Sequence, residues 1–283
     1  MVCRMTFSIV ARSDDGQSWG VAVASKFLAV GSVVPAAVAG VGAIATQAEA
    51  NVAYKGLALS HMDEGATASV ALQRLLEEDP GREDRQVGIV DVDGGAASHT
   101  GRDCFEWAGS LIGDGVAIQG NILTGPQVVE AMQASWDASA DEPDLARRLL
   151  AALAAGDDAG GDKRGRQSAA LLVVHEGAGY GGNDDVAVDL RVDDHTDPVT
   201  ELGRLLDLND LYLTASTEEE KVPVGATLQD ELDDRARGLG HHDFHAWVGS
   251  ENYEMRVSGP GDEKPWVDQR VLATLREQSE AVR

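Results

Sequence analysis

Short runs of alternating apolar and polar residues recur along the chain up to Leu213 and predict β-strands. The first two runs are Thr6 to Arg12 and Trp19 to Ser25, separated by the sequence SDDG, which is typical of a turn. We therefore expect a hairpin at the start of the chain. Further strands are expected over 38–46, 86–92, 95–100, 116–123, 168–175 and 186–192.

Helical spacing of apolar residues occurs in pairs of segments between these strand groups. The expected helices are 48–62, 66–78, 126–138, 145–155 and 198–208. Paired helices between groups of strands favour packed sheets with helices outside them over a strictly alternating parallel sheet. The predicted fold class is therefore α+β. No G-x-G-x-x-G at a strand–helix junction and no phosphate-binding G-x-x-x-x-G-K-[ST] occurs in the sequence.

The character of the chain changes after Leu213. Residues 214–221 (TASTEEEK) predict an acidic linker between a main domain, 5–213, and a small C-terminal domain, 222–283. The small domain is expected to contain helices near 228–237 and from Val267, with an aromatic segment between them. Its aromatic residues predict a small core better than a sugar-binding surface.

Composition restricts the possible partners. Among 283 residues, 23 are Lys or Arg and 48 are Asp or Glu, which gives a net charge of −25. So negative a protein is a poor partner for nucleic acid or an anionic membrane. Only five of the basic residues are Lys. Two explanations stay open: a salt-loving host, or coding bias with an acidic tail.

The predicted location is the cytoplasm. The first residues are too short and polar for a secretion signal, and Cys3 and Cys104 are interpreted as free thiols in a reducing compartment. Residues 27–48 carry no charge and are long enough to span a membrane. Because this stretch contains glycines and a proline, two buried strands joined at a turn are expected instead.

Thr6 is the first candidate for chemistry. A Thr with a free α-amino group can act as a nucleophile, with that amine, of pKa near 8, as general base. Translation from Met5, or processing after it, would make Thr6 the N-terminus. The alternative is that Thr6 only begins an ordinary strand. The hairpin also brings Ser25 and Lys26 beside Thr6, where a lysine can stabilise an oxyanion; the alternative there is a solvated lysine at a strand end.

Seven sequence blocks together resemble the domain-of-unknown-function family one-zero-two-eight. The blocks, from Met5 to about Leu213, are MTFSIVAR, WGVAVASKFLAVGSVVP, GAIATQAEAN, PGREDRQVGIVD, HTG, IQGNIL and GGDKRGRQSAALLVV. That family is similar in fold to the N-terminal nucleophile hydrolases, so the resemblance implies a four-layer αββα sandwich. Family members typically begin at the Met before Thr-Phe-Ser. The tail resembles a peptidoglycan-binding domain often appended to this family.

The resemblance also implies roles for residues of this chain. Thr6 is of the same residue type as the nucleophile of N-terminal nucleophile enzymes such as proteasome subunits, and Lys26 and Ser25 lie beside it. The oxyanion and substrate-binding candidates are Thr46, Gln47, Asn51, Gln119 and Asn121. Asp162 and Ser168 resemble the residues that support the nucleophile, although their spacing differs from the proteasome pattern.

The sequence thus predicts an amide hydrolase that cleaves a small amide or short peptide through Thr6, with no metal and no organic cofactor. His241, His242 and His245 lack the H-E-x-x-H spacing of a zinc site and are interpreted as structural. The alternative function is a non-catalytic binding or assembly protein on the same fold, binding glycan through its tail. A homo-oligomer is compatible with either function.

Overall fold

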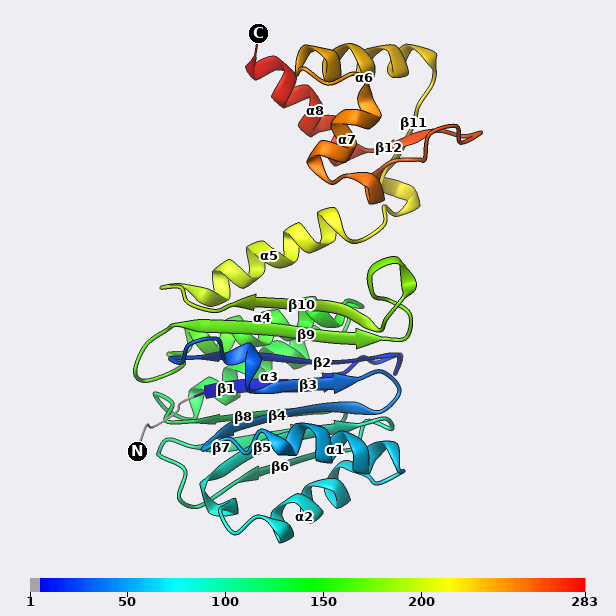
Figure 1. Ribbon diagram of the computed structural model, residues 1–283. Coiled ribbons are helices and arrows are strands. Elements are labelled where there is room, and N and C mark those ends of the chain that lie inside the picture. The colour runs from blue at the N-terminus through cyan, green and yellow to red at the C-terminus, as the bar shows by residue number, and fades with distance from the viewer. Residues whose placement is uncertain (1–5, 283) are drawn as a thin grey trace. The chain divides into compact units, whose positions relative to one another are not determined.

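The computed structural model describes residues 6–282 and divides the chain into two compact units, Met1–Arg204 and Leu205–Arg283. Antiparallel sheets of six and four strands form the first unit (Figure 1). The six-stranded sheet has the order β10-β9-β2-β1-β8-β7, and the four-stranded sheet the order β3-β4-β5-β6. The fold is therefore mixed α and β.

The strands of the first unit follow most of the expected segments. Their bounds are β1 Thr6–Arg12, β2 Ser18–Ser25, β3 Pro35–Val38, β4 Gly42–Ala48, β5 Arg85–Asp91, β6 Ala96–Thr100, β7 Gly109–Gly113, β8 Val116–Asn121, β9 Ser168–His175 and β10 Val186–Val192. The uncharged stretch 27–48 forms β3 and β4, preceded by a short 3-10 helix, as expected from its glycines and proline. No helix within residues 6–282 is long and apolar enough to cross a membrane.

Apolar side chains from the two sheets meet in one core. Val10 and Val21 of the larger sheet pack with Ala43, Ala45 and Val90 of the smaller sheet. Side chains alternate along a strand, so the residues next to Val10 point to the opposite face. Phe7, on that opposite face of β1, lies near Gly156 in a helix. Both faces of the larger sheet are therefore covered, which explains the nearly continuous burial of β1 and β2.

Two pairs of helices cover the outer faces of the sheets. Helices α1 (Ala53–Asp63) and α2 (Ala68–Glu78) pack on the four-stranded sheet (Figure 1). Helices α3 (Gln127–Ala138) and α4 (Leu145–Asp158) pack on the six-stranded sheet. Asp144 caps α4 by accepting hydrogen bonds from the backbone of Ala146 and Arg147, which satisfies N–H groups that the helix cannot pair.

The second unit has its own core. It contains β11 (Lys221–Pro223), α6 (Ala226–Gly238), α7 (Phe244–Glu251), β12 (Trp266–Asp268) and α8 (Gln269–Ala281). Phe244, Trp247 and Tyr253 are buried among aliphatic side chains, so these aromatics are core residues. The buried guanidinium of Arg256 pairs with the buried carboxylate of Asp268 at 3.0 Å.

The boundary between the units differs from the predicted linker. Helix α5 (Pro198–Tyr212) begins in the first unit and ends in the second. Within 214–221, Ser216 is buried and donates a hydrogen bond to Asp268 at 2.6 Å. This segment therefore belongs to the folded second unit. Met5 and Cys3, on which the predicted start and one predicted free thiol rest, lie outside the described residues.

Candidate functional site

Four buried polar residues lie side by side at the ends of four neighbouring strands. Thr6 of β1 is the register partner of Asn121 in β8, and Ser25 of β2 is the partner of Ser168 in β9. The hydroxyl oxygens of Thr6 and Ser25 are 3.2 Å apart. We call Asn121, Thr6, Ser25 and Ser168 the polar row; each is at most 3% exposed.

The polar row lies on the side of the larger sheet that faces the smaller one. Thr6, Ser8 and Val10 alternate along β1 and therefore share a face, and Val10 belongs to the core between the sheets. The same alternation relates Ser25 to Val23 in that core. Polar groups thus replace apolar ones where the core between the sheets reaches the start of β1.

A chain of buried side-chain hydrogen bonds connects the two sheets behind Thr6. Gln119 Nε2 donates to Ser8 Oγ at 2.6 Å, and Ser8 Oγ donates to Gln47 Oε1 at 2.7 Å. Gln47 Nε2 and Asn121 Nδ2 then donate to Gln86 Oε1 at 2.8 and 2.9 Å. We call these five residues the amide network. Buried amides paired in this way fix the relative position of the elements that carry them.

The amide network also holds the backbone of Thr6. Gln47 Nε2 and Asn121 Nδ2 lie 3.3 and 3.5 Å from the Thr6 carbonyl oxygen, to which they donate. The amide nitrogens predicted as oxyanion donors are therefore directed at protein acceptors. In this arrangement they position the candidate nucleophile.

Two other predicted residues are engaged elsewhere. The backbone N–H of Thr46 donates to Val34 O, and its side chain is fully buried. Asn51 Nδ2 donates to Asp79 Oδ2, which also accepts from Tyr54 and Arg85. The hydrogen bond from Arg85 holds the pKa of Asp79 well below its ordinary value. Burial, with the adjacent carboxylate, raises the pKa of Tyr54 well above its ordinary value.

Lys26 lies next to the polar row in the chain, but its ammonium is exposed. Its Nζ donates to the backbone oxygen of Arg166 at 3.2 Å, and its backbone N–H donates to Asp162 Oδ2 at 2.7 Å. Ser168 Oγ donates to Phe27 O and accepts from Val30 N. Asp162 and Ser168 thus hold the segment that follows β2.

The structure therefore brings Thr6, Ser25, Asn121 and Ser168 together, with Gln47 and Gln119 behind them. It does not bring Asn51 or the side chain of Thr46 into this group. Ser8 and Gln86 were missed in the sequence. Their signal was polar residues at positions where strands β1 and β5 are otherwise apolar and buried.

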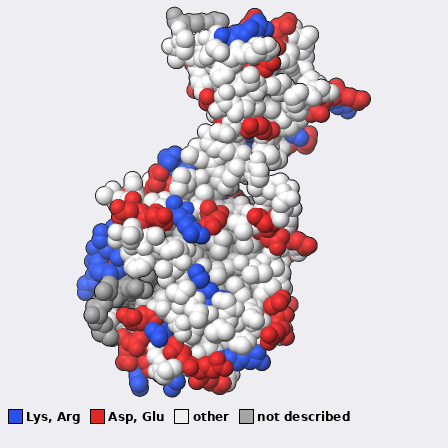
Figure 2. Space-filling model, viewed as in Figure 1, with Lys and Arg blue, Asp and Glu red and all other residues white. Residues whose placement is uncertain are grey.

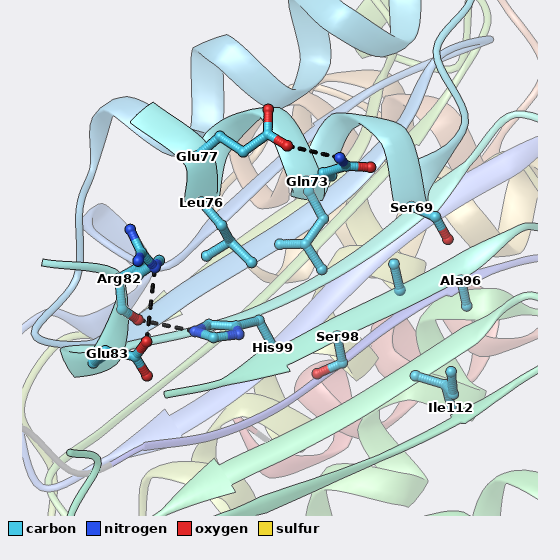
Figure 3. Close-up of a pocket in the computed structure, with 12 residues that line it drawn as sticks. Ser69, Gln73, Leu76, Glu77, Arg82, Glu83, Ala96, Ser98, His99 and Ile112 are labelled. Carbon is cyan, nitrogen blue, oxygen red and sulfur yellow. Dashed lines mark hydrogen bonds and ion pairs between the residues drawn. The ribbon is translucent and has the colours of Figure 1, made fainter. Parts of the chain in front are cut away.

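A large open groove of about 800 Å³ lies away from the polar row (Figure 3). It runs between α2 and the edge strand β6 and reaches Ile112 of β7. Leu72, Leu76 and Ala97 give it apolar walls. His99 lines it and forms a hydrogen bond with the backbone oxygen of Arg82 through Nε2 at 2.9 Å. No group of three His, Cys, Asp or Glu side chains within residues 6–282 is arranged to hold a metal ion.

The first unit is thus a mixed α and β domain in which two antiparallel sheets share a core. A pair of helices covers each sheet, and the polar row lies at the start of β1. The chain belongs to the family of unknown function DUF1028, whose model matches residues 6–202. It is similar to the crystal structure of protein SPO2555 from Silicibacter pomeroyi, of the same family, with 31% identity and a TM-score of 0.66. That match covers 73% of this chain and 89% of the other. No curated protein matches the chain.

Proposed function

We propose that the first unit is an amide hydrolase of the N-terminal nucleophile type, with Thr6 as nucleophile. The observation that carries this proposal is the setting of Thr6. Its hydroxyl lies in the polar row, and its carbonyl accepts hydrogen bonds from Gln47 and Asn121. A reacting group held from several sides is preorganised, which is what catalysis at a fixed geometry requires.

The packing of the first unit supports the proposal. Helices α1 and α2 cover one sheet, α3 and α4 cover the other, and the two sheets share a core. We infer from this order the four-layer αββα sandwich of N-terminal nucleophile hydrolases. Fold likeness alone does not give function, so the proposal rests on Thr6.

The reaction has two halves. Thr6 Oγ attacks the carbonyl carbon of an amide, and the α-amine of Thr6, once free, takes the hydroxyl proton. The amine passes this proton to the leaving nitrogen, and an ester to Thr6 Oγ remains. Water, deprotonated by the same amine, then hydrolyses the ester and restores the Thr6 hydroxyl.

Neighbouring residues have distinct roles in this reaction. The Ser25 hydroxyl, 3.2 Å from that of Thr6, orients it. Lys26 supplies a positive charge at the edge of the site, which favours the anionic tetrahedral intermediate. The substrate is a small amide or short peptide. None of these steps calls on a metal or an organic cofactor.

The test begins with the intact mass and N-terminal sequence of the protein from its native host. A mature chain that starts at Thr6 is expected, and retention of Met1 or Val2 excludes the mechanism. Thr6→Ala is then expected to abolish hydrolysis in a screen of amides, whereas Thr6→Ser retains a hydroxyl and part of the activity. Thr214→Ala, an exposed position of the second unit, is the matched control.

A non-catalytic binding protein is the second candidate. The groove beside α2 and β6 favours it, because this large concave surface is lined by residues other than Thr6 (Figure 3). Glycan binding by the second unit belongs to this candidate. It predicts that ligand binding survives Thr6→Ala and that the chain keeps residues ahead of Thr6.

A further inference from the structure

We propose that the substrate carries an anionic group, and that four basic residues beside the polar row recognise it. These residues, Lys26, Lys163, Arg164 and Arg166, are called the basic rim. This inference deepens the proposed function and rests on it, since it names the class of amide that would reach Thr6.

The loop that carries most of the basic rim is attached on both sides of β1. On the β8 side, Leu123 and Asp162 form an isolated β-bridge, and Lys163 N donates to Ile122 O at 3.3 Å. Ile122 directly follows Asn121 of the polar row. This places residues 162 and 163 at the end of the strand that pairs with Thr6.

On the β2 side, the same loop is fastened to Lys26. The Asp162 carboxylate accepts the backbone N–H of Lys26, and the backbone oxygen of Arg166 accepts a hydrogen bond from Lys26 Nζ. Lys26 directly follows Ser25, whose hydroxyl lies beside that of Thr6. The loop therefore connects the two strands that flank β1, and its basic residues border the start of that strand.

Carboxylates pair with the two arginines of the basic rim. Arg164 pairs with Asp162 at 3.3 Å, and Arg166 pairs with Asp157 at 2.9 Å and with Asp197 at 3.9 Å. Within residues 6–282, no carboxylate forms an ion pair with the ammonium of Lys26 or Lys163. Among the described residues, Lys26 and Lys163 therefore remain without an ion pair, in a chain whose net charge is −25.

The surface charge fits this arrangement. Figure 2 shows a group of Lys and Arg atoms on the side of the first unit where β1 begins, with acidic atoms next to it. In a strongly acidic protein, such a local positive region attracts anions and repels cations. Arg166 keeps N–H donors beyond those that face Asp157 and Asp197, because a guanidinium has five.

These observations point to an amide that also bears a carboxylate, with the amide carbonyl at Thr6 and the carboxylate at the basic rim. Lys163 is then a specificity residue that takes no part in proton transfer. Charge attraction of this kind weakens as salt screens it, so binding of the anionic amide falls with ionic strength.

The test compares succinamate with succinamide, two amides of nearly equal size that differ in one negative charge. Binding is measured by calorimetry at fixed low ionic strength on a Thr6→Ala chain that starts at residue 6 and cannot turn them over. We expect succinamate to bind about tenfold more tightly. Lys163→Gln is expected to reduce its affinity about threefold, whereas Lys264→Gln, an exposed lysine of the second unit, changes nothing.

Equal affinities for the two amides, no binding of either, or no effect of Lys163→Gln would overturn the inference. Turnover is measured separately on the chain with Thr6 intact. Selective binding of succinamate without hydrolysis of any amide would leave the anion site standing and remove the proposed function. Hydrolysis that prefers neutral amides would support the proposed function and remove the anion site.

Discussion

The hydroxyl groups of Thr6 and Ser25 face each other across two paired strands, with their oxygens 3.2 Å apart and both side chains almost fully buried. Two hydroxyls at this distance share one hydrogen bond, so the orientation of either depends on the other. A substitution of Ser25 therefore tests most directly whether the Thr6 hydroxyl is oriented for reaction.

Ser25→Ala is expected to lower amide turnover about tenfold, because Thr6 Oγ loses the partner that orients it. The loss of the hydrogen bond to Thr6 should lower the free energy of unfolding by about 1 kcal/mol. Steady-state kinetics and urea denaturation measure the two effects, with the exposed Ser250→Ala as control. A large loss of stability with unchanged turnover would make Ser25 a purely structural residue.

Gln47 and Gln119 are both buried amides, but they contribute differently to the amide network. Gln47 uses its oxygen and its nitrogen, whereas Gln119 Oε1 has no hydrogen-bond partner among the described residues. Gln47→Met should therefore cost about 2–3 kcal/mol, since it leaves buried groups unpaired. Gln119→Met should cost about 1 kcal/mol or less, because it also removes an unpaired oxygen. Chemical denaturation gives both values, and equal costs would contradict this account.

Asp79 accepts hydrogen bonds from Asn51, Tyr54 and Arg85 and joins the ends of α2 and β5. Asp79→Asn is expected to destabilise the first unit by about 3 kcal/mol, because the partly buried Arg85 loses its ion pair. Asp189→Asn, which breaks an exposed ion pair with Arg191, should cost less than about 0.5 kcal/mol.

The Asp79 carboxylate also makes the stability of the folded protein depend on pH in a known direction. The folded-state pKa of Asp79 lies below its ordinary value of 3.8. Its contribution to stability is therefore complete above that value and is lost as the pH falls below it towards the folded-state pKa. Thermal unfolding between pH 6 and about pH 2 should show a steeper acid loss in the parent protein than in Asp79→Asn. Parallel curves would contradict the assignment.

Gly88 of β5 has no space for a side chain. A Cβ there would lie 2.0 Å from Gln119 Oε1 and 2.5 Å from Gln119 Cδ, and Gln119 is held by Ser8. Gly88→Ala should therefore cost about 2–3 kcal/mol. Gly56→Ala is the matched control, since this helical glycine has nothing within 4 Å and alanine should stabilise the helix by about 0.5–1 kcal/mol. The midpoint of urea unfolding measures both changes.

The local pattern of apolar and polar residues was sufficient to predict much of the fold. The apolar alternation of Thr6–Arg12 and the turn after it predicted β1 and the hairpin, and with it the neighbourhood of Thr6 and Ser25. Strand β7 (Gly109–Gly113) was missed, because a short edge strand flanked by glycines has no clear alternation. The strand expected over 38–46 begins only at Gly42, because Gly40, with a φ of +70°, lies in the turn that separates β3 from β4.

The site was harder to predict than the fold because its contacts join distant strands. Gln86 meets Asn121 only when the smaller sheet packs on the larger one, and nothing local to Gln86 indicates that partner. Asn51, which the family resemblance implied as a candidate together with Thr46 and Gln47, lies near the end of β4 in the chain. Its side chain instead binds Asp79, which lies beyond α2.

The 162–166 loop is attached to both neighbours of β1. Its attachment and its charge at the surface therefore depend on different residues. Asp162 makes the side-chain contact that fastens the loop, while Lys163, Arg164 and Arg166 present exposed side chains. Arg164 and Arg166 pair with the buried carboxylates of Asp162 and Asp157, so Lys163 is the residue that selection can change without disturbing the sheets. A change at Asp162 instead loosens the whole loop. A scaffold built in this way can retain one chemistry and adapt to new substrates through single surface substitutions.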